Sequence, residues 1–539
     1  MKELSDKILA MFDGLGIDHE HIVQLADQGV SQEYLYSITT PFPVLGRYRK
    51  YIAFMDDLTS LKALCKYRVM VIVEYFIALA DTMANYDGTF RDKKIISFPL
   101  TEPMKQALRA VSQNLTPQQI AQIEAIEAKA DHDTAAITDW TKFIVDYCDI
   151  LGTARASKEL ENCLDGFHFG RTSEDVNSPV FALVNRELFF KHLIPEIIAF
   201  QESLIKHARE FDRVTAGLTH GQPAEPTTIG KQFMNAVAAI DSILRQVFLP
   251  CDETGARKPI SFPVKTFGAV GNHSDLRAAY PDIDWIENDQ RFVAALGPGL
   301  HLDMMVTQAS LYGEYKRIYD AVCTIARHIL KFTGDFWGWT SFQWFRKKRK
   351  EGVKGSSVMP NKYNPWRMEG ASKVLEKFIV QLEYTSKALM DYPYEGDMGR
   401  SIIMRDICDD FAKFFIALGR IREELQLYEV NEEKIDEFLR DNPGLVGGAA
   451  QTILKRSRVE GDAYRYIQQM MINPDGTYVS QEEFSEKMAQ SRDIPPGVKE
   501  EILRLAKPES NTGYAEELAL MAVAQAEETI RNLRVLYKT

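Results

Sequence analysis

The chain is poor in cysteine, and its cysteines form no metal or disulfide motif. Its 539 residues include six cysteines, none of them in a CxxC pair, and no HExxH sequence occurs. These absences argue against a zinc site and against a disulfide framework. We therefore expect buried free thiols, no metal and no organic cofactor.

The glycine-rich loops of common nucleotide-binding folds are missing as well. Residues 268–272 (GAVGN) are a glycine-rich turn without the GxGxxG spacing or a βαβ context, and no GxxxxGK[ST] loop is present. Dinucleotide binding of the Rossmann type is therefore rejected, and a P-loop is absent.

Long apolar runs and an excess of positive charge are also lacking. No apolar stretch is long enough to cross a bilayer, and the start of the chain does not resemble a secretion signal. The net charge of −12 disfavours nucleic-acid binding. We expect a cytoplasmic protein that binds neither membrane nor nucleic acid. The short basic cluster at 346–350 is either a solvated helix end or a minor attraction for an anionic substrate.

Helical periodicity dominates what is present. Apolar residues recur at the spacing of one helix face in long segments, at 191–211, 225–249, 303–345 and 366–391. Long helices with short connections predict an all-α fold built on a central bundle. Changes in segment length and turn content predict three domains, at 1–160, 161–427 and 428–539.

Two segments carry candidate catalytic groups. Residues 355–365 (GSSVMPNKYNP) combine glycine with two prolines, which suits either a plain interhelical loop or a mobile lid carrying Ser356 and Ser357. Residues 219–228 (THGQPAEPTT) separate two long helices and present His220 among hydroxyls and an amide. A lone histidine is more often structural than catalytic, but one positioned in a site is the natural acid or base near neutral pH.

Three further clusters are more polar than a core requires. They are Asp131–His132–Asp133, Thr172–Ser173–Glu174–Asp175 and Gly46–Arg47–Tyr48. The Thr-Ser-Glu-Asp run also fits an N-terminal helix cap, and that alternative alone would explain it.

Together these segments resemble the fumarase/aspartase superfamily and, within it, the bacterial type of the adenylosuccinate lyase family. The lid GSSxMPxKxNP is typical of the superfamily. The narrower resemblance depends on THGQPAxPTTIGK, HFxxTSEDVN, HD, GAVGN with AAYPDIDW, and GRY, in the family's order over roughly 45–510. It implies a homotetramer of three-domain, all-α subunits whose active sites are each assembled from three subunits. The implied reaction is β-elimination of fumarate from a succinylated purine nucleotide, without a cofactor.

The resemblance also implies roles for individual residues. Ser356 would be the base and His220 the acid, with Glu369 as a candidate to orient that histidine. The remaining matched positions are expected to contact the nucleotide substrate: Arg47, Tyr48, Asp131, His132, Asp133, Thr172, Ser173, Gln308, Ser357, Lys362, Asn364, Arg400, Ser401 and Arg405.

The chain departs from the family pattern at 308–313, where a QIEPHD-like stretch reads QASLYG, and at two glycines on the substrate side. The pattern has an arginine where this chain has Gly396, and Arg400 four residues later is a candidate replacement. The pattern has an asparagine after Glu369, where this chain has Gly370. Such changes bear on substrate affinity and choice more than on reaction type.

Two alternative functions stay open at this point. One is another lyase of the superfamily, such as argininosuccinate lyase, fumarase or aspartase, although the GRY motif and the Ser401/Arg405 pair suit a phosphate. The other is a non-catalytic structural relative, which the joint presence of His220, Ser356 and Lys362 disfavours.

Overall fold

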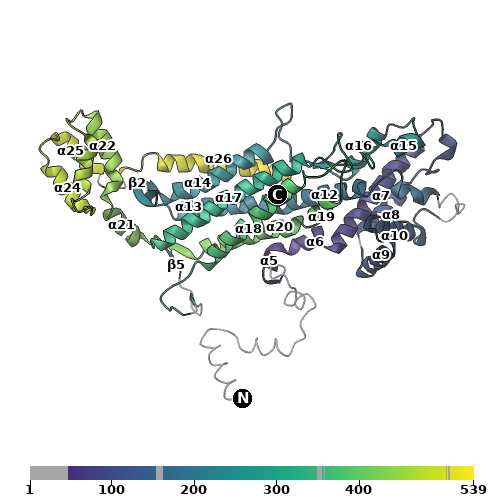
Figure 1. The fold of residues 1–539 in the computed structure, drawn as a ribbon, viewed down its shortest axis with the longest axis horizontal. Helices are drawn as coiled ribbons and strands as arrows, with labels where there is room; N and C mark the ends of the chain where they lie inside the picture. The colour runs from purple at the N-terminus through teal and green to yellow at the C-terminus, as the bar shows by residue number, and fades with distance from the viewer. Residues whose placement is uncertain are drawn as a thin grey trace, which may run out of the picture.

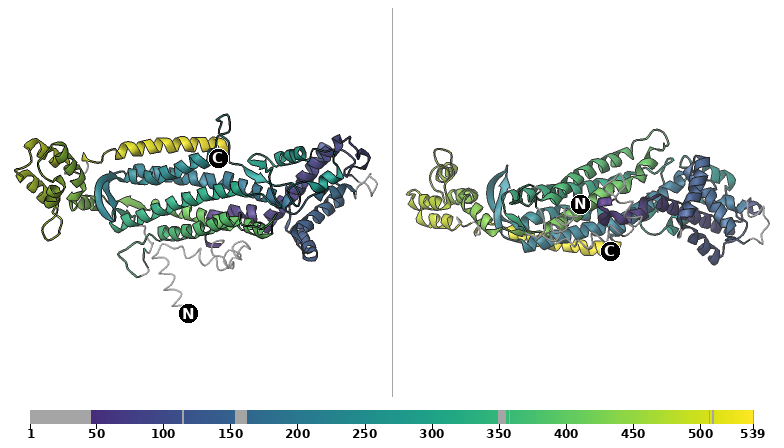
Figure 2. Two further views of the ribbon diagram at one scale, coloured as in Figure 1. Left: turned by 45° about the horizontal axis from the view of Figure 1, so that its top comes forward. Right: turned by 90° about the horizontal axis from the view of Figure 1, so that it is seen from below.

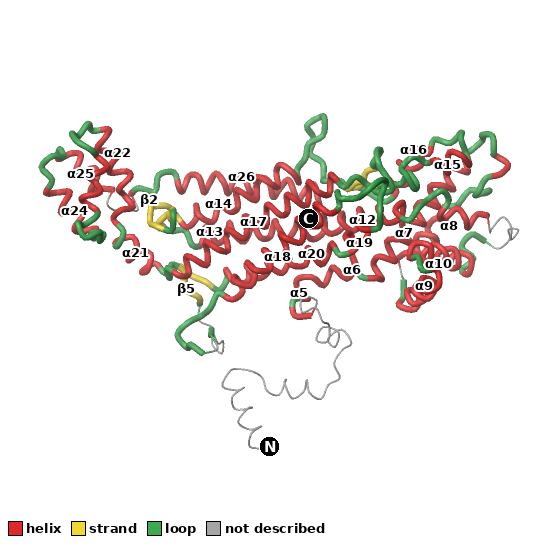
Figure 3. The backbone as a smooth tube through the Cα atoms, viewed as in Figure 1, coloured by secondary structure: helices red, strands yellow, loops and turns green. Residues whose placement is uncertain are grey.

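The computed structural model describes residues 46–113, 115–152, 162–348, 355–356, 358–505, 507 and 510–538. Within these ranges the chain is an elongated, mostly helical molecule with three groups of helices along its length (Figure 1). The strands of the described ranges are short and form three two-stranded sheets. The all-α prediction is therefore confirmed, with few short strands added (Figure 3). No helix among the described residues combines the length and apolar character that spanning a bilayer needs.

The amino-terminal group starts alongside the middle of the molecule and continues to one end of it (Figure 1). Its helices are α5 (Arg49–Ile52), α6 (Asp56–Thr59), α7 (Leu61–Asn85), α8 (Glu102–Gln113), α9 (Pro117–Ala130) and α10 (Asp133–Tyr147).

The central group comprises the long bundle and two short helices, over 274–279 and 285–295, that lie at the amino-terminal end of the molecule (Figure 1). Its helices are α12 (Glu174–Glu187), α13 (Ile194–Glu210), α14 (Ile229–Ile243), α15 (Ser274–Ala279), α16 (Trp285–Ala295), α17 (Gly313–Ser341), α18 (Trp366–Ala388), α19 (Gly399–Arg405) and α20 (Ile407–Leu425). Its strands are β1 (Val214–Thr219), β2 (Gln222–Thr228), β3 (Phe262–Val264), β4 (Leu300–Leu302) and β5 (Phe345–Lys347). Antiparallel β1–β2 is a hairpin, and β3 pairs in parallel with β4.

The carboxy-terminal group has an apolar cluster of its own, between Val446 and Ile502. Its elements are β6 (Tyr428–Val430), which pairs with β5, and α21 (Glu432–Arg440), α22 (Gly447–Arg456), α23 (Ala463–Met471), α24 (Gln481–Gln490) and α25 (Pro496–Leu505). The last helix, α26 (Ala515–Tyr537), instead runs back along α14 (Figure 2). The Tyr537 hydroxyl donates to the Phe248 carbonyl at 2.8 Å. The domain boundaries near 160 and 427 stay a prediction.

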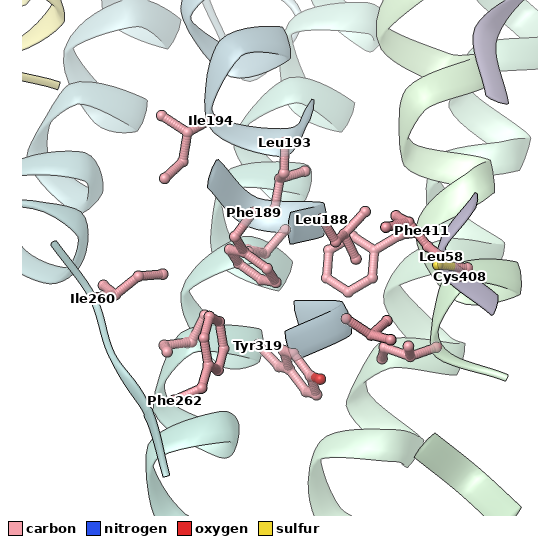
Figure 4. Close-up of a cluster of buried hydrophobic side chains, with 14 of the residues drawn as sticks. Leu58, Leu188, Phe189, Leu193, Ile194, Ile260, Phe262, Tyr319, Cys408 and Phe411 are labelled. Atoms are coloured by element: carbon pink, nitrogen blue, oxygen red, sulfur yellow. The ribbon is translucent and has the colours of Figure 1, made fainter. Parts of the chain in front are cut away.

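The main core includes a π-helical turn that interrupts the continuous helix from α12 to α13. This turn, Leu188–Leu193, presents Phe189 to the rings of Phe262 and Phe411, with centroids 5.5 and 5.4 Å away (Figure 4). Pro195 follows the turn and cannot donate a backbone hydrogen bond, which fits a wider turn at this place.

The long helices lie where periodicity placed them, but two begin later than expected. Residues 225–228 belong to β2, because Pro223 and Pro226 cannot sustain a helix, and the Thr228 hydroxyl caps α14 by accepting from the Lys231 amide at 3.1 Å. Residues 303–312 precede α17 because their backbone is paired elsewhere. One such bond runs from the Gln308 amide to the Glu395 carbonyl at 2.9 Å.

Candidate active site

His132 and Ser173 meet where α10 and α12 begin. Nδ1 of His132 accepts the Ala135 amide at 3.3 Å and so caps α10, while its Nε2 lies 3.3 Å from Ser173 Oγ. Because Nδ1 is an acceptor, the proton of the neutral ring is assigned to Nε2, which donates to the serine. Ser173 makes no side-chain capping bond to α12, so the alternative that this run is only a helix cap fails for Ser173. Asp131 ends α9 in a left-handed conformation, with φ of 50°.

This pair borders an open pocket of about 340 Å³. Its lining includes Thr172, His168, Asp139 and Lys142. Burial lowers the pKa of His168. The charge of Asp175 opposes this effect, and the charge of Arg171 adds to it.

Asp133 joins two arginines beside the pocket. Its Oδ2 accepts from Nη2 of Arg68 and from Nη2 of Arg405, both at 2.7 Å. Burial alone would raise the pKa of the Asp133 carboxyl, but the two guanidinium groups outweigh it and hold that pKa below its usual value. Asp133 therefore positions Arg405.

Arg400 is a buried cation whose hydrogen-bonding groups are mostly unused. Its side chain is 2% exposed and lies over the Tyr392 ring, 3.7 Å from the centroid. Within the described ranges, Nη2 donates only to the Asp397 carbonyl at 3.4 Å, and Nε and Nη1 have no acceptor. The buried hydroxyl of Ser401 also lacks a partner in the part of the chain that the structure describes.

The neighbourhood of Gly396 explains why Arg400 fits there. Gly396 has φ of 153°, and a Cβ at this position would lie 2.6 Å from Nη2 of Arg400 and 2.8 Å from Oε1 of Gln308. The guanidinium of Arg400 thus occupies the space directly beside the position where the family pattern carries an arginine.

Two more buried atoms near Arg400 have no hydrogen-bond partner among the residues described, namely the Tyr312 hydroxyl oxygen and Oε2 of Glu174. Burial raises the pKa of Glu174, and the Asn177 hydrogen bond and the charges of Lys265 and Arg400 oppose this. Buried polar atoms are rarely left unpaired in a native protein. Several unpaired buried polar atoms close together are the pattern expected of a site that binds a polar ligand.

A buried ion pair supports the start of α12. Nζ of Lys265 lies 2.6 Å from Oδ1 of Asp175, with both side chains fully buried. Oδ2 of Asp175 accepts the Thr172 amide at 2.8 Å, which fixes the residue preceding Ser173. Sequence reasoning missed Lys265 and Arg68 as parts of this region, because their partners Asp175 and Asp133 lie far away along the chain.

His220 lies in the turn of the β1–β2 hairpin, at the end of the bundle that adjoins the carboxy-terminal helices (Figures 1 and 2). It has φ of 54° and is followed by Gly221 with φ of 73°. Two consecutive positive φ values are typical of a tight hairpin turn. Within the described part of the chain its exposed ring makes no hydrogen bond or ion pair.

The expected lid connects β5 to α18. Ser356 Oγ accepts the Met359 amide at 3.2 Å, while the Lys362 side chain is exposed. The lid's downstream end is fixed by Lys347, whose Nζ donates to the Asn364 carbonyl at 3.2 Å. Ser357 lies outside the described residues.

Glu369, the expected orienter of His220, lies in the first turn of α18. Its Oε1 accepts from the Trp337 indole at 3.2 Å. Arg47 and Tyr48 lie just before α5. Arg47 is exposed, and its guanidinium carbon is 5.9 Å from the centroid of the Tyr48 ring.

One chain therefore brings together only part of the expected site. The groups on α10, α12 and α19 form one region, whereas the hairpin that carries His220 lies at the opposite end of the bundle (Figures 1 and 2). No group of three or more His, Cys, Asp or Glu side chains in the described ranges is arranged to hold a metal ion.

Comparisons with known proteins agree with these features. The model of the family described as Lyase matches residues 59–378, more than half of the chain. Adenylosuccinate lyase of Legionella pneumophila (strain Corby) is 26% identical over 88% of this chain and 97% of its own length. The protein of that name from Dictyostelium discoideum is 28% identical over 78% of this chain and 86% of its own.

Solved structures share the fold. A fumarate lyase from Mesorhizobium sp. BNC1 has a TM-score of 0.61 at 15% identity, covering 89% of this chain and 98% of that one. A 3-carboxy-cis,cis-muconate lactonizing enzyme from Pseudomonas putida also has a TM-score of 0.61 at 15% identity, covering 92% and 99%.

Proposed function

This chain belongs to the lyase family, and on that premise we propose that it is an adenylosuccinate lyase. It eliminates fumarate from adenylosuccinate, giving AMP, and from the succinylated nucleotide SAICAR, giving AICAR, in purine biosynthesis. The relatives of that name, matched over most of both chains, support this substrate choice.

The observation that carries the proposal is the set of unused donors on α19. Two nitrogens of the buried Arg400 guanidinium, the Ser401 hydroxyl and Nε of Arg405 have no hydrogen-bond partner among the described residues. A substrate with one phosphate and two carboxylates supplies anionic oxygens for such donors. Charge-assisted bonds of this kind are among the strongest that proteins make.

The elimination requires a base and an acid on two sides of the substrate. Ser356 removes a proton from the succinyl carbon beside a carboxylate. The electron pair forms the double bond of fumarate as the carbon–nitrogen bond breaks, and His220 protonates the departing nitrogen. A serine hydroxyl is a weak base at neutral pH, so closure of the lid, loss of water and the charge of Lys362 are needed to activate it. Cations and donors around the carboxylate stabilise the carbanion-like intermediate.

The complete site is assembled from three subunits of a homotetramer. The distance along the bundle between the His220 hairpin and the His132 region supports this, because a second copy must supply the missing group (Figure 1). Apolar side chains exposed on α17 and α18, including Trp337, Val380 and Tyr384, provide a surface for such assembly. The enzyme works in the cytoplasm.

The direct test measures fumarate release by the purified protein. Adenylosuccinate, argininosuccinate, malate and aspartate are supplied separately, and fumarate formation is followed for each. We expect turnover of adenylosuccinate, and loss of nearly all of it in Ser356→Ala with substrate binding retained. Ser341→Ala, an exposed hydroxyl on α17, is the control. Fumarate from argininosuccinate but not from adenylosuccinate would reassign the substrate, and near-normal Ser356→Ala turnover would move the base elsewhere.

Shared sites have a separate test. Inactive His220→Ala and Ser356→Ala proteins are dissociated, mixed and reassembled. If the two groups come from different subunits, random mixing restores activity to about one quarter of wild type. No recovery in properly reassembled protein would place both groups in one chain.

A further inference from the structure

Arg420, on α20, lies between the expected nucleotide-binding segment and the end of the lid. Its side chain is 6% exposed. Nη1 donates to the Tyr48 hydroxyl at 3.1 Å and Nη2 donates to the Trp366 carbonyl at 3.2 Å. The guanidinium carbon also lies 5.4 Å from the centroid of the Tyr48 ring and 5.2 Å from that of Trp366. Arg420 thus connects the start of α5 to the start of α18.

The charge of Arg420 is not neutralised by a neighbouring carboxylate. Glu424, one turn further along α20, is paired with Lys347 and Arg367, and Glu423 is paired with Lys50. Among the described residues no carboxylate forms an ion pair with Arg420, and its Nε has no acceptor. A buried cation without a counter-ion is costly for a fold, unless it serves a ligand of opposite charge.

Gly370 provides the room for this guanidinium. A Cβ on Gly370 would lie 2.4 Å from Nη2 of Arg420 and 2.8 Å from its Cζ. Gly370 lies within α18 and has no positive φ, so the helix itself gains nothing from glycine and loses about 1 kcal/mol relative to alanine. The glycine at 370 is therefore explained by the space that the Arg420 guanidinium occupies. The asparagine that the family pattern carries here has no room while Arg420 keeps its position.

The hydrogen bond to Tyr48 has a chemical consequence. The Tyr48 oxygen accepts from the guanidinium, which leaves the phenolic O–H free to donate to something else. A cationic donor polarises the phenol and strengthens that remaining donor. A phenol in this state suits an anionic oxygen of a nucleotide.

We propose that Arg420 is a positioning residue that orients Tyr48, and the first residue of α18 after the lid, for binding the anionic nucleotide. This rests on the proposed function, in which Tyr48 contacts the nucleotide. The arginine acts through Tyr48 and touches no reacting atom.

The test is a cycle of Arg420→Gln, Tyr48→Phe and the double variant. We expect Arg420→Gln to raise KM for adenylosuccinate tenfold or more with kcat changed by less than about threefold, because uniform binding is lost. Added to Tyr48→Phe, the same change should have less than about a twofold effect on KM. Arg420→Lys, which keeps a cation, should restore part of the loss. Arg422→Gln is the control, since Arg422 is on the same helix and pairs with Glu196.

Gly370→Ala tests the same idea without removing the arginine. Its Cβ displaces the guanidinium while alanine favours the helix, so KM should rise with little loss of thermal stability. The dissociation constant for AMP is measured for every variant, which gives a readout independent of turnover. The positioning role would be overturned if KM and AMP affinity were unchanged in both Arg420→Gln and Gly370→Ala. It would also be overturned if the fold-changes in KM of Arg420→Gln and Tyr48→Phe multiplied in the double variant. A wild-type enzyme that binds AMP and turns over adenylosuccinate in that experiment leaves the proposed function standing. Wild-type protein that neither binds AMP nor releases fumarate would overturn both.

Discussion

Replacing Asp133 by asparagine tests the electrostatic centre of the candidate site. Asp133 Oδ2 is 2.7 Å from a nitrogen of Arg68 and 2.7 Å from a nitrogen of Arg405. The asparagine keeps the shape of the side chain but removes the charge, which leaves two guanidinium groups close together. Breaking a buried ion pair by removing one partner costs about 3–5 kcal/mol.

The arginines contribute unequally to that cost. The Arg68 side chain is 6% exposed and that of Arg405 is 33% exposed, so water replaces part of the second interaction but little of the first. We therefore expect Asp133→Asn to lower the free energy of unfolding by about 3 kcal/mol, at the lower end of that range. Because Arg405 also loses its anchor, KM for the nucleotide should rise roughly tenfold.

The assay is urea unfolding at one protein concentration, since assembly links stability to concentration. The folded-state pKa of Asp133 lies below its ordinary value of 3.8. The carboxylate thus stabilises the fold above the unfolded-state pKa, and this contribution is lost as pH falls through the lower folded-state pKa. The difference in free energy of unfolding between wild type and Asp133→Asn should stay constant from pH 8 to about 5. It should disappear only below about pH 4.

Asp146→Asn is the matched control, because Asp146 is exposed on the same helix. The reasoning about Asp133 would be refuted if Asp133→Asn lowered the free energy of unfolding by less than about 1 kcal/mol. It would also be refuted if the difference from wild type disappeared between pH 8 and 5.

Three further predictions follow from the described residues. Burial raises the pKa of Asp410 to about 6, so its charge costs stability as pH rises from about 4 to 6; Asp410→Asn should raise the free energy of unfolding by roughly 1–3 kcal/mol at pH 8 and change little at pH 4. Iodoacetamide at pH 8 should label Cys148 and Cys251 in the native protein and spare the buried thiols, as counted by mass spectrometry; fast labelling of a third thiol would contradict the packing. Gly396→Ala should cost about 1–3 kcal/mol in urea unfolding and raise KM by displacing Arg400; unchanged stability and KM would show that the glycine is dispensable.

The sequence was sufficient to predict the helical architecture, because long helices leave a periodic apolar pattern. It was less informative where the backbone bonds to distant segments. The strand before α14 reads as the start of a helix by hydrophobicity, yet Pro223 and Pro226 exclude one there, and the His220 turn closes a hairpin instead.

The candidate site was predictable only where motifs mark it. His132 and Ser173 lie 41 residues apart and meet, as their motifs suggest. Arg68 pairs with Asp133 across 65 positions, and Lys265 pairs with Asp175 across 90. Nothing in the local pattern around Arg68 or Lys265 predicts such a partner, because the pairing depends on how separate helices pack.

The two glycines that replace larger side chains of the family pattern have the same physical explanation. At Gly396 and at Gly370 the missing side chain leaves room for a guanidinium that comes from another position, Arg400 in the first case and Arg420 in the second. A residue-by-residue comparison records a lost arginine and a lost asparagine, and from that alone a weaker site would be expected. In space, each glycine instead borders a buried cation with unused donors. Substrate binding at each of these places therefore depends on which side chain occupies the space beside the glycine. Restoring the family residue at Gly396 or Gly370 should impair the enzyme, unless the neighbouring arginine is replaced by a shorter residue as well.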